Sequence, residues 1–157
     1  MTLTFDGNAE QAVKFYTSIF KNSKVINTAY VTDSVAKNNG KRAGSVLTIG
    51  FKLNGQNFVA MNGGPQVKFN EAVSLMVHCD TQVELDRYWK RLTSGGGKAV
   101  ACGWLQDKYG LFWQIVPKDI IKIISGKDAA RVDRVMRVVM DSVKLDFKRI
   151  KAAAKGK

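Results

Sequence analysis

Gln114 is the polar residue of this sequence that most clearly invites a functional interpretation, because it stands alone in the apolar run Leu111–Val116. A polar side chain in the middle of an apolar strand is either hydrogen-bonded to a neighbour or lines a cavity, since an unpaired buried amide is costly. In a largely apolar cleft, an amide suits a small planar or aliphatic ligand.

The one histidine, His78, is the residue whose type suits proton transfer near neutral pH. It shares strand parity with Ser74 and Met76 in the run 72–79, so we expect the three side chains on one face. A catalytic role and an incidental one are both open for His78.

A hairpin must position Gln114. The segment 102–117 is predicted to form two short strands joined by a polar turn, Asp107–Gly110, in which Gly110 supplies a positive φ. Alternation along the second strand places Phe112, Gln114 and Val116 on one face and Leu111, Trp113 and Ile115 on the other.

The remaining elements follow the same order twice. We expect a strand over 1–5, a helix capped by Asn8, a strand over 24–32, a mobile loop over 33–42, and a hairpin whose strands, 45–53 and 57–61, are joined at Asn54–Gly55. A strand over 72–79, a helix begun near Asp80 and Thr81 and carrying Val83, a strand over 98–101 and the 102–117 hairpin repeat the pattern.

The C-terminal segment is predicted to be helical and basic. A short turn or helix over 119–126, an amphipathic helix over 129–143 and a last helix capped by Asp146 account for it, with the final residues 155–157 frayed. The net charge is +12, and residues 118–157 contribute twelve Lys and Arg against five Asp and Glu. A solvated helix face and a phosphate-binding surface are both compatible with this charge.

Three segments resemble one protein family: FDGNAEQAVKFYTSIF at 5–20, FVAMNGGPQVKFNEAVSLMV at 58–77 and CGWLQDKYGLFWQIVP at 102–117. They are similar to the PhnB-like branch of the vicinal-oxygen-chelate (glyoxalase/bleomycin resistance/dioxygenase) superfamily, often labelled 3-demethylubiquinone-9 3-methyltransferase. The resemblance implies an α+β fold of two βαβββ modules, 1–64 and 65–117, that form a curved mixed sheet around a cleft, with a helical extension over 118–157.

The resemblance also implies ligand positions for a divalent metal in the cleft. They fall at about Met1, at Ala60 or Asn62, at Ser74 and at Gln114. None of these is His, Asp or Glu, and an amide with a hydroxyl makes a poor site for a divalent ion. We therefore expect no bound metal and no cofactor.

The expected ligand-binding cleft combines these positions with neighbouring apolar side chains. Its predicted lining residues are Phe58, Ala60, Asn62, Ser74, Met76, Trp104, Phe112 and Gln114. A packed core without a cavity is the alternative. The glycine-rich segments Gly95–Gly97 and Asn62–Gly64 lack the strand–loop–helix context of a dinucleotide or S-adenosylmethionine loop, so the methyltransferase label has no support from motifs.

We therefore expect a small-molecule-binding protein or enzyme whose reaction the sequence does not name. A non-catalytic, ligand-sequestering protein and a basic nucleic-acid-associated protein are the alternatives. The chain has no apolar run long enough to span a membrane, so we expect no membrane contact. Cys79 and Cys102 are not spaced as a metal-binding or redox pair, which favours a cytoplasmic protein with two reduced, buried thiols. A homodimer is expected because the helix over 129–143 carries an additional apolar stripe: Val132, Val135, Met136, Val139, Met140 and Val143.

Overall fold

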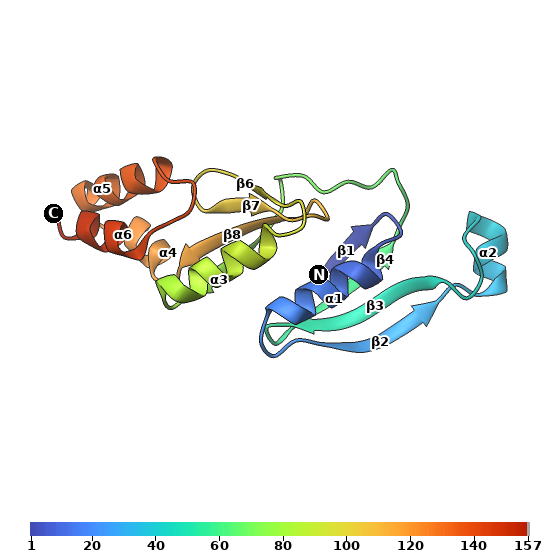
Figure 1. Cartoon of the computed structure of the whole chain (residues 1–157). Helices are drawn as coiled ribbons and strands as arrows, with labels where there is room; N and C mark the ends of the chain where they lie inside the picture. Colours follow the sequence, from blue (N-terminus) through green and yellow to red (C-terminus); the bar gives the residue numbers. More distant parts are fainter. Residues whose placement is uncertain (157) are drawn as a thin grey trace. The chain divides into compact units, whose positions relative to one another are not determined.

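The computed structural model describes residues 1–156, apart from the side chain of Asn39. The expected frayed end includes Lys157, which lies outside the described residues. The chain forms two compact units, Met1–Lys68 and Phe69–Lys157 (Figure 1).

The first unit is a four-stranded sheet with one helix packed on it. Its elements are β1 (Thr2–Phe5), α1 (Ala9–Ile19), β2 (Lys24–Tyr30), α2 (Asp33–Asn39), β3 (Val46–Leu53) and β4 (Gln56–Asn62). The strand order is β1-β4-β3-β2, with β1 parallel to β4 and the other pairs antiparallel. The apolar face of α1, which includes the fully buried Ala12 and Tyr16, covers one face of this sheet.

The predicted hairpin turn between β3 and β4 is confirmed. Both Asn54 and Gly55 have positive φ, 49° and 82°. Two consecutive positive φ values give the turn a twist that matches the flanking strands.

Residues 33–39 are helical, so the loop expected over 33–42 is corrected there. The Thr32 side chain accepts a hydrogen bond from the backbone N–H of Val35, and Gly40 ends the helix with a φ of 69°. A threonine at the N-terminal cap and a glycine in the left-handed conformation at the C-terminal end are common at the two ends of a helix.

The second unit begins with the same plan. Its elements are β5 (Ser74–Cys79), α3 (Gln82–Leu92), β6 (Lys98–Ala99), β7 (Trp104–Gln106) and β8 (Phe112–Pro117). The strand order, β5-β8-β7-β6, reproduces that of the first unit, and β5 is parallel to β8. The predicted repeat and the α+β class with two βαβββ modules are confirmed.

Helix α3 covers one face of the second sheet through Leu85, Tyr88 and Leu92, all buried. Val83 was expected to belong to this apolar face, but it is 79% exposed. It lies in the first turn, on the side of the helix away from the sheet. At the other end, a Cβ on Gly97 would lie 2.7 Å from the carbonyl oxygen of Leu92, so only glycine permits the return of the chain.

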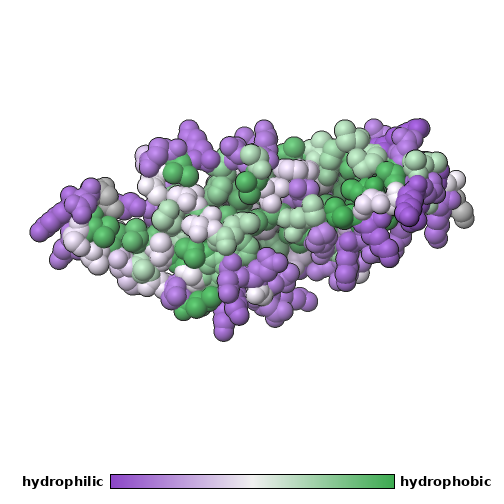
Figure 2. Space-filling view, turned by 180° about the vertical axis from the view of Figure 1, so that it is seen from behind, coloured by the Kyte–Doolittle hydropathy of each residue, from purple (hydrophilic) through white to green (hydrophobic). Residues whose placement is uncertain are grey.

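Three helices complete the second unit: α4 (Ile120–Ile124), α5 (Ala129–Met140) and α6 (Phe147–Ala154). Helix α5 ends three residues earlier than expected because the next residues pair with another segment. The carbonyls of Ser142 and Val143 accept hydrogen bonds from Cys102 and Gly103. Figure 2 shows hydrophilic and hydrophobic side chains side by side at the end of the chain that carries these helices. No helix within residues 1–156 is long and apolar enough to span a membrane.

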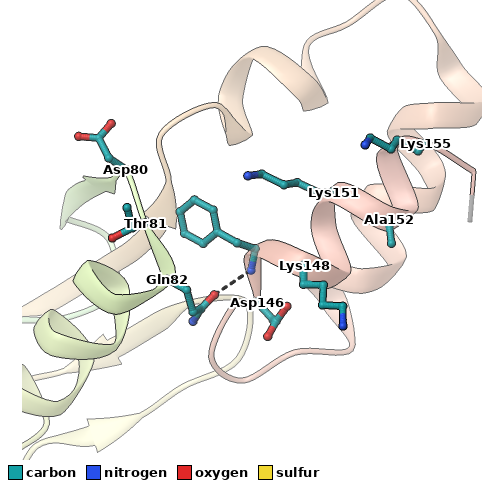
Figure 3. A pocket seen from close by; sticks show the side chains of 9 residues that line it. Asp80, Thr81, Gln82, Asp146, Lys148, Lys151, Ala152 and Lys155 are labelled. Atoms are coloured by element: carbon teal, nitrogen blue, oxygen red, sulfur yellow. Dashed lines mark hydrogen bonds between the residues drawn. The ribbon is translucent and has the colours of Figure 1, made fainter.

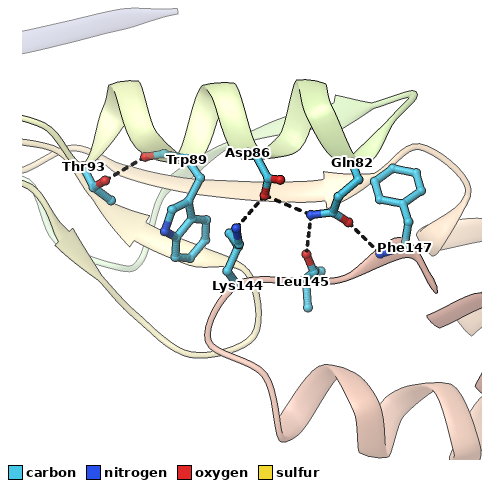
Figure 4. Close-up of polar contacts among 7 residues, drawn as sticks. All are labelled: Gln82, Asp86, Trp89, Thr93, Lys144, Leu145 and Phe147. Atoms are coloured by element: carbon cyan, nitrogen blue, oxygen red, sulfur yellow. Dashed lines mark hydrogen bonds and ion pairs between the residues drawn. The ribbon is translucent and has the colours of Figure 1, made fainter. Parts of the chain in front are cut away.

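A glutamine fastens α6 to α3. The amide of Gln82 donates to the carboxylate of Asp86 and to the carbonyl of Leu145, and its oxygen accepts the backbone N–H of Phe147 at 2.8 Å (Figure 4). Lys144 also pairs with Asp86. The start of α6 is therefore held by side chains of α3 rather than by apolar packing alone.

Candidate functional site

The face of the second sheet opposite α3 carries two cross-strand rows of three residues. Met76, Gln114 and Trp104 form one row, and Ser74, Phe112 and Gln106 form the next. Directly paired residues of neighbouring strands project to the same face. We call these six residues the β5–β8–β7 patch. The strand parity predicted for β5 and β8 agrees with this register.

Gln114 lies at the centre of its row and is half-buried. Its Nε2 donates a hydrogen bond to the hydroxyl of Ser74 at 2.8 Å. Among the described residues, its amide oxygen accepts no hydrogen bond. The pair thus satisfies one donor and leaves an acceptor and a hydroxyl proton available to a bound molecule.

The neighbours of Gln114 are large and polarisable. Met76 is 39% exposed, Trp104 is half-buried, and Phe112 is 8% exposed. A thioether and two aromatic rings around one amide resemble the composition of small-molecule sites, in which a few polar groups orient a ligand against apolar walls.

Gln106 is the patch residue that the sequence analysis did not select. Its Nε2 donates to the carbonyl of Gly110 at 3.1 Å, so the side chain folds back on the hairpin turn. The signal that could have identified it is its place opposite Phe112, which becomes evident only once the β7–β8 register is known.

His78 lies on the same face but one row beyond the patch. Its partner in β8 is Val116, its side chain is exposed, and it makes no hydrogen bond with the described part of the chain. Two residues along a strand correspond to roughly 7 Å. A catalytic role for His78 stays a prediction.

The three candidate residues of the first unit lie on the face of their sheet that α1 covers, which corrects the expected parity of β4. Phe58 and Ala60 are 7% and 0% exposed, and Phe58 stacks on Phe51 with ring centroids 5.5 Å apart. Their alternates, Val59 and Met61, lie on the opposite face. Packing against α1 decides this parity, because both sets of side chains are apolar.

Asn62 is used by the fold of the first unit. Its oxygen accepts the backbone N–H of Ala9 at 3.0 Å, and its amide donates to the carbonyl of Val46 at 3.0 Å. Asn62 therefore caps α1, whereas the side chain of Asn8, the expected cap, makes no such bond. Both ends of this amide are engaged, unlike those of Gln114. A cavity of about 250 Å³ beside it is lined by charges of both signs, including Glu10 and Lys41.

The residues at the positions where the resemblance implies metal ligands do not fit a divalent ion. Ser74 and Gln114 bond to each other, Ala60 is an apolar core residue, and Asn62 caps a helix. Within residues 1–156, no group of three or more His, Cys, Asp or Glu side chains is placed to hold a metal. A hydroxyl and an amide supply no negative charge, which oxygen-binding cations require to replace their hydration.

The glycine-rich segments are connections between elements of the fold. Gly95–Gly97 follows α3 and precedes β6, whereas Asn62–Gly64 begins at the last residue of β4 and precedes no helix. A phosphate-binding loop needs the N-terminus of a helix directly after it. Neither segment meets that condition.

Comparisons with known proteins agree with this architecture. A model of the family "3-demethylubiquinone-9 3-methyltransferase" matches residues 1–116. The PhnB protein of Bacillus cereus, described under the same methyltransferase name, is 33% identical over 73% of this chain and 94% of its own, with a TM-score of 0.63. No curated protein sequence is significantly similar to this chain.

Two further solved structures are less similar in sequence. Protein PA1353 from Pseudomonas aeruginosa is 16% identical over 71% of this chain and 90% of its own, with a TM-score of 0.54, which indicates a shared fold. The fosfomycin resistance protein FosX from Listeria monocytogenes is 17% identical over 72% and 84%, with a TM-score of 0.49.

Two βαβββ units with the same strand order define a two-module protein of the vicinal-oxygen-chelate type. Within that class, the chain belongs to the 3-demethylubiquinone-9 3-methyltransferase family, in its PhnB-like branch. Helices α4, α5 and α6 lie beyond the residues that the family model matches.

Proposed function

We propose that the protein binds a small planar or aliphatic molecule at the β5–β8–β7 patch, without help from a metal ion. The observation that carries this proposal is the row Met76–Gln114–Trp104, in which an amide with an available oxygen lies between a thioether and an indole. The apolar neighbours supply contact area and the amide orients the ligand.

Binding and sequestration suit this site better than acid–base or metal catalysis. The patch contains no carboxylate, imidazole or thiol, and its donor set does not fit a divalent ion. General acid–base chemistry needs a titratable group within hydrogen-bond reach of the substrate. His78, one row away, is the group that a catalytic version of this proposal would use.

A metabolite screen by thermal shift tests the proposal, because a ligand that binds only the native state raises the melting temperature. The screen is run with and without Mn²⁺ or Mg²⁺. We expect a compound that stabilises the protein equally in both, and whose effect is lost in Gln114→Ala. Gln11→Ala, which removes an exposed amide from α1, is the matched control.

Recovery of the bound compound separates binding from turnover. Mass spectrometry after incubation should return it unchanged from the wild type. If the wild type converted the compound and His78→Ala did not, the protein would be an enzyme that uses His78 and not a sequestering protein. Stabilisation that requires the divalent ion, or that survives Gln114→Ala, would contradict the proposed site.

We also propose a cytoplasmic homodimer. The outer strand β2 exposes Val25, Ile26 and Tyr30 by half or more, and Met140 and Val143 are 65% and 55% exposed. Exposed apolar groups of this kind favour self-association, and two free cysteines suit a reducing compartment. Sedimentation should give twice the 17.4 kDa of one chain. A single species of the monomer mass would rule out the dimer.

A further inference from the structure

The second unit contains a cavity of about 620 Å³ at the C-terminal ends of β5 and β8. The strands contribute Cys79 and Pro117, and the rest of the wall comes from α4, α5, α6 and the residues beside them. The cavity lies at the other end of β5 and β8 from Ser74 and Phe112, and helices outside the family match close it. It is therefore a site distinct from the β5–β8–β7 patch.

The floor of this cavity is apolar and uncharged. Ile150 is 2% exposed, Pro117 and Cys79 are buried, and Phe147 and Ile123 are half-buried. Burial raises the pKa of the Cys79 thiol to about 12, with a smaller contribution from Glu84, so the thiol is protonated at neutral pH. Such a floor accommodates a hydrocarbon surface.

The rim is positively charged. Five Lys and Arg side chains and two Asp side chains line the cavity, a surplus of three positive charges. Lys118 and Asp80 pair with each other at 3.0 Å. The other four cations, Lys122, Arg131, Lys151 and Lys155, form no ion pair with any residue that the structure describes.

These four cations come from different elements and surround one opening. Lys122 belongs to α4, Arg131 to α5 and Lys151 to α6, and Lys155 follows α6 directly. Figure 3 shows a second pocket, which shares Asp80, Phe147, Lys151 and Lys155 with this cavity. In that view the ammonium groups of Lys151 and Lys155 point toward the side that carries Asp80. The Lys151 ammonium lies 5.8 Å from the ring centre of Phe147, at the boundary between rim and floor. Convergence from three helices distinguishes this rim from an ordinary solvated helix face.

From this arrangement we propose that the cavity binds an amphipathic anion, a molecule with an apolar body and a single carboxylate or phosphate group. The body lies on the floor formed by Ile150, Phe147 and Pro117, and the anionic group is held by the rim cations. A volume of about 620 Å³ is within the usual range of small-molecule sites. This inference does not rest on the function proposed for the β5–β8–β7 patch.

Titration calorimetry with decanoate and with decyl phosphate tests the inference, and the tighter ligand identifies the head group. The double variant Lys122→Gln/Lys151→Gln should weaken binding at least about tenfold, because hydrogen bonds to charged groups are among the stronger ones. The control Lys14→Gln/Lys127→Gln removes the same charge from exposed positions that do not line the cavity. It should bind as the wild type does.

Probes that lack the charge and probes that lack the apolar body complete the experiment. Decanol, acetate and inorganic phosphate should each bind at least about tenfold more weakly than the better amphipathic anion, since each lacks one of the two required contacts. Gln114→Ala should leave the affinity unchanged, which separates this site from the patch. The inference would be overturned if neither amphipathic anion bound, if decanol bound as tightly as they do, or if the two double variants lost affinity equally. It would also be overturned if a single-stranded oligonucleotide displaced bound decyl phosphate as effectively as decanoate does.

Discussion

The buried carboxylate of Asp107 accepts the indole N–H of Trp113 at 2.8 Å. The same carboxylate accepts the backbone N–H groups of Tyr109 and Leu111, so it binds the hairpin turn and the next strand together. Trp113 itself is 1% exposed on the α3 side of the sheet. The most conspicuous acid of the hairpin is thus a structural group, and its position fixes the face on which Gln114 lies.

Trp113→Ala should lower the free energy of unfolding by roughly 3–5 kcal/mol, as large aromatic deletions in packed cores do. Trp113→Phe keeps most of the ring volume but removes the N–H, so it should cost about 1–3 kcal/mol, the penalty of removing a partner from a buried polar group. Urea denaturation measures both values. Trp89→Phe, at a half-buried position of α3, is the control and should cost less than either. A loss below about 1 kcal/mol for Trp113→Ala would contradict the strand parity.

Gln82→Ala should destabilise the attachment of α6 to α3. It removes the acceptor of the Phe147 N–H and the donor to the Leu145 carbonyl, both part-buried, at a cost of about 1–3 kcal/mol. Hydrogen exchange should show faster exchange in α6 with little change in α1. Gln11→Ala serves again as the exposed control. If the amides of α6 were protected from exchange as well in the variant as in the wild type, apolar packing alone would hold the helix.

The pH dependence of stability should report the pair between Asp86 and Lys144. The hydrogen bond from Lys144, followed by that from Gln82, lowers the pKa of Asp86 below its ordinary value of 3.8. A depressed acid pKa stabilises the folded state above the unfolded value, and this contribution is lost as the pH falls through the folded value. The pair is nearly half exposed, so the effect is small.

Melting temperatures of the wild type and of Lys144→Gln test that sign. The wild type should be more stable from about pH 5 upward, and the difference should shrink toward zero below about pH 3. Lys14 forms no ion pair with any residue that the structure describes, so Lys14→Gln should show no comparable trend. A difference that grows as the pH falls would refute the assignment.

Strand parity could be predicted from the sequence in one unit and not in the other. In β8, a single amide among apolar residues marks the face opposite the core, and β5 follows from its register. In β4, both alternating sets are apolar, so the sequence pattern does not distinguish them. The packing of α1 on Phe58 and Ala60 decides the matter, and that contact joins residues far apart in the chain.

Helix α2 shows that local signals were present but misinterpreted. Asn38, Asn39 and Gly40 suggested a loop, yet a glycine after asparagine is also a common end of a helix. Thr32 supplied the matching start. The basic cavity is a different case, because its wall combines Cys79, Pro117 and three C-terminal helices. No spacing rule brings such distant positions together before the fold is known.

The last prediction concerns the two thiols, both of which were expected to be buried. Cys79 is buried, but Cys102 is partly exposed, with a φ of 61° and its sulfur 3.7 Å from that of Met140. Thiolates are the reactive form, and burial raises the pKa of Cys79 to about 12. Iodoacetamide at about pH 8 should therefore modify the accessible Cys102 in the native protein and both cysteines after denaturation. Native Cys102→Ser should stay unmodified over the time in which the wild type gains one label, as followed by mass spectrometry. Rapid labelling of Cys79 in that variant would show that the floor of the basic cavity is open to water, and would remove the apolar contact on which binding of an amphipathic anion depends.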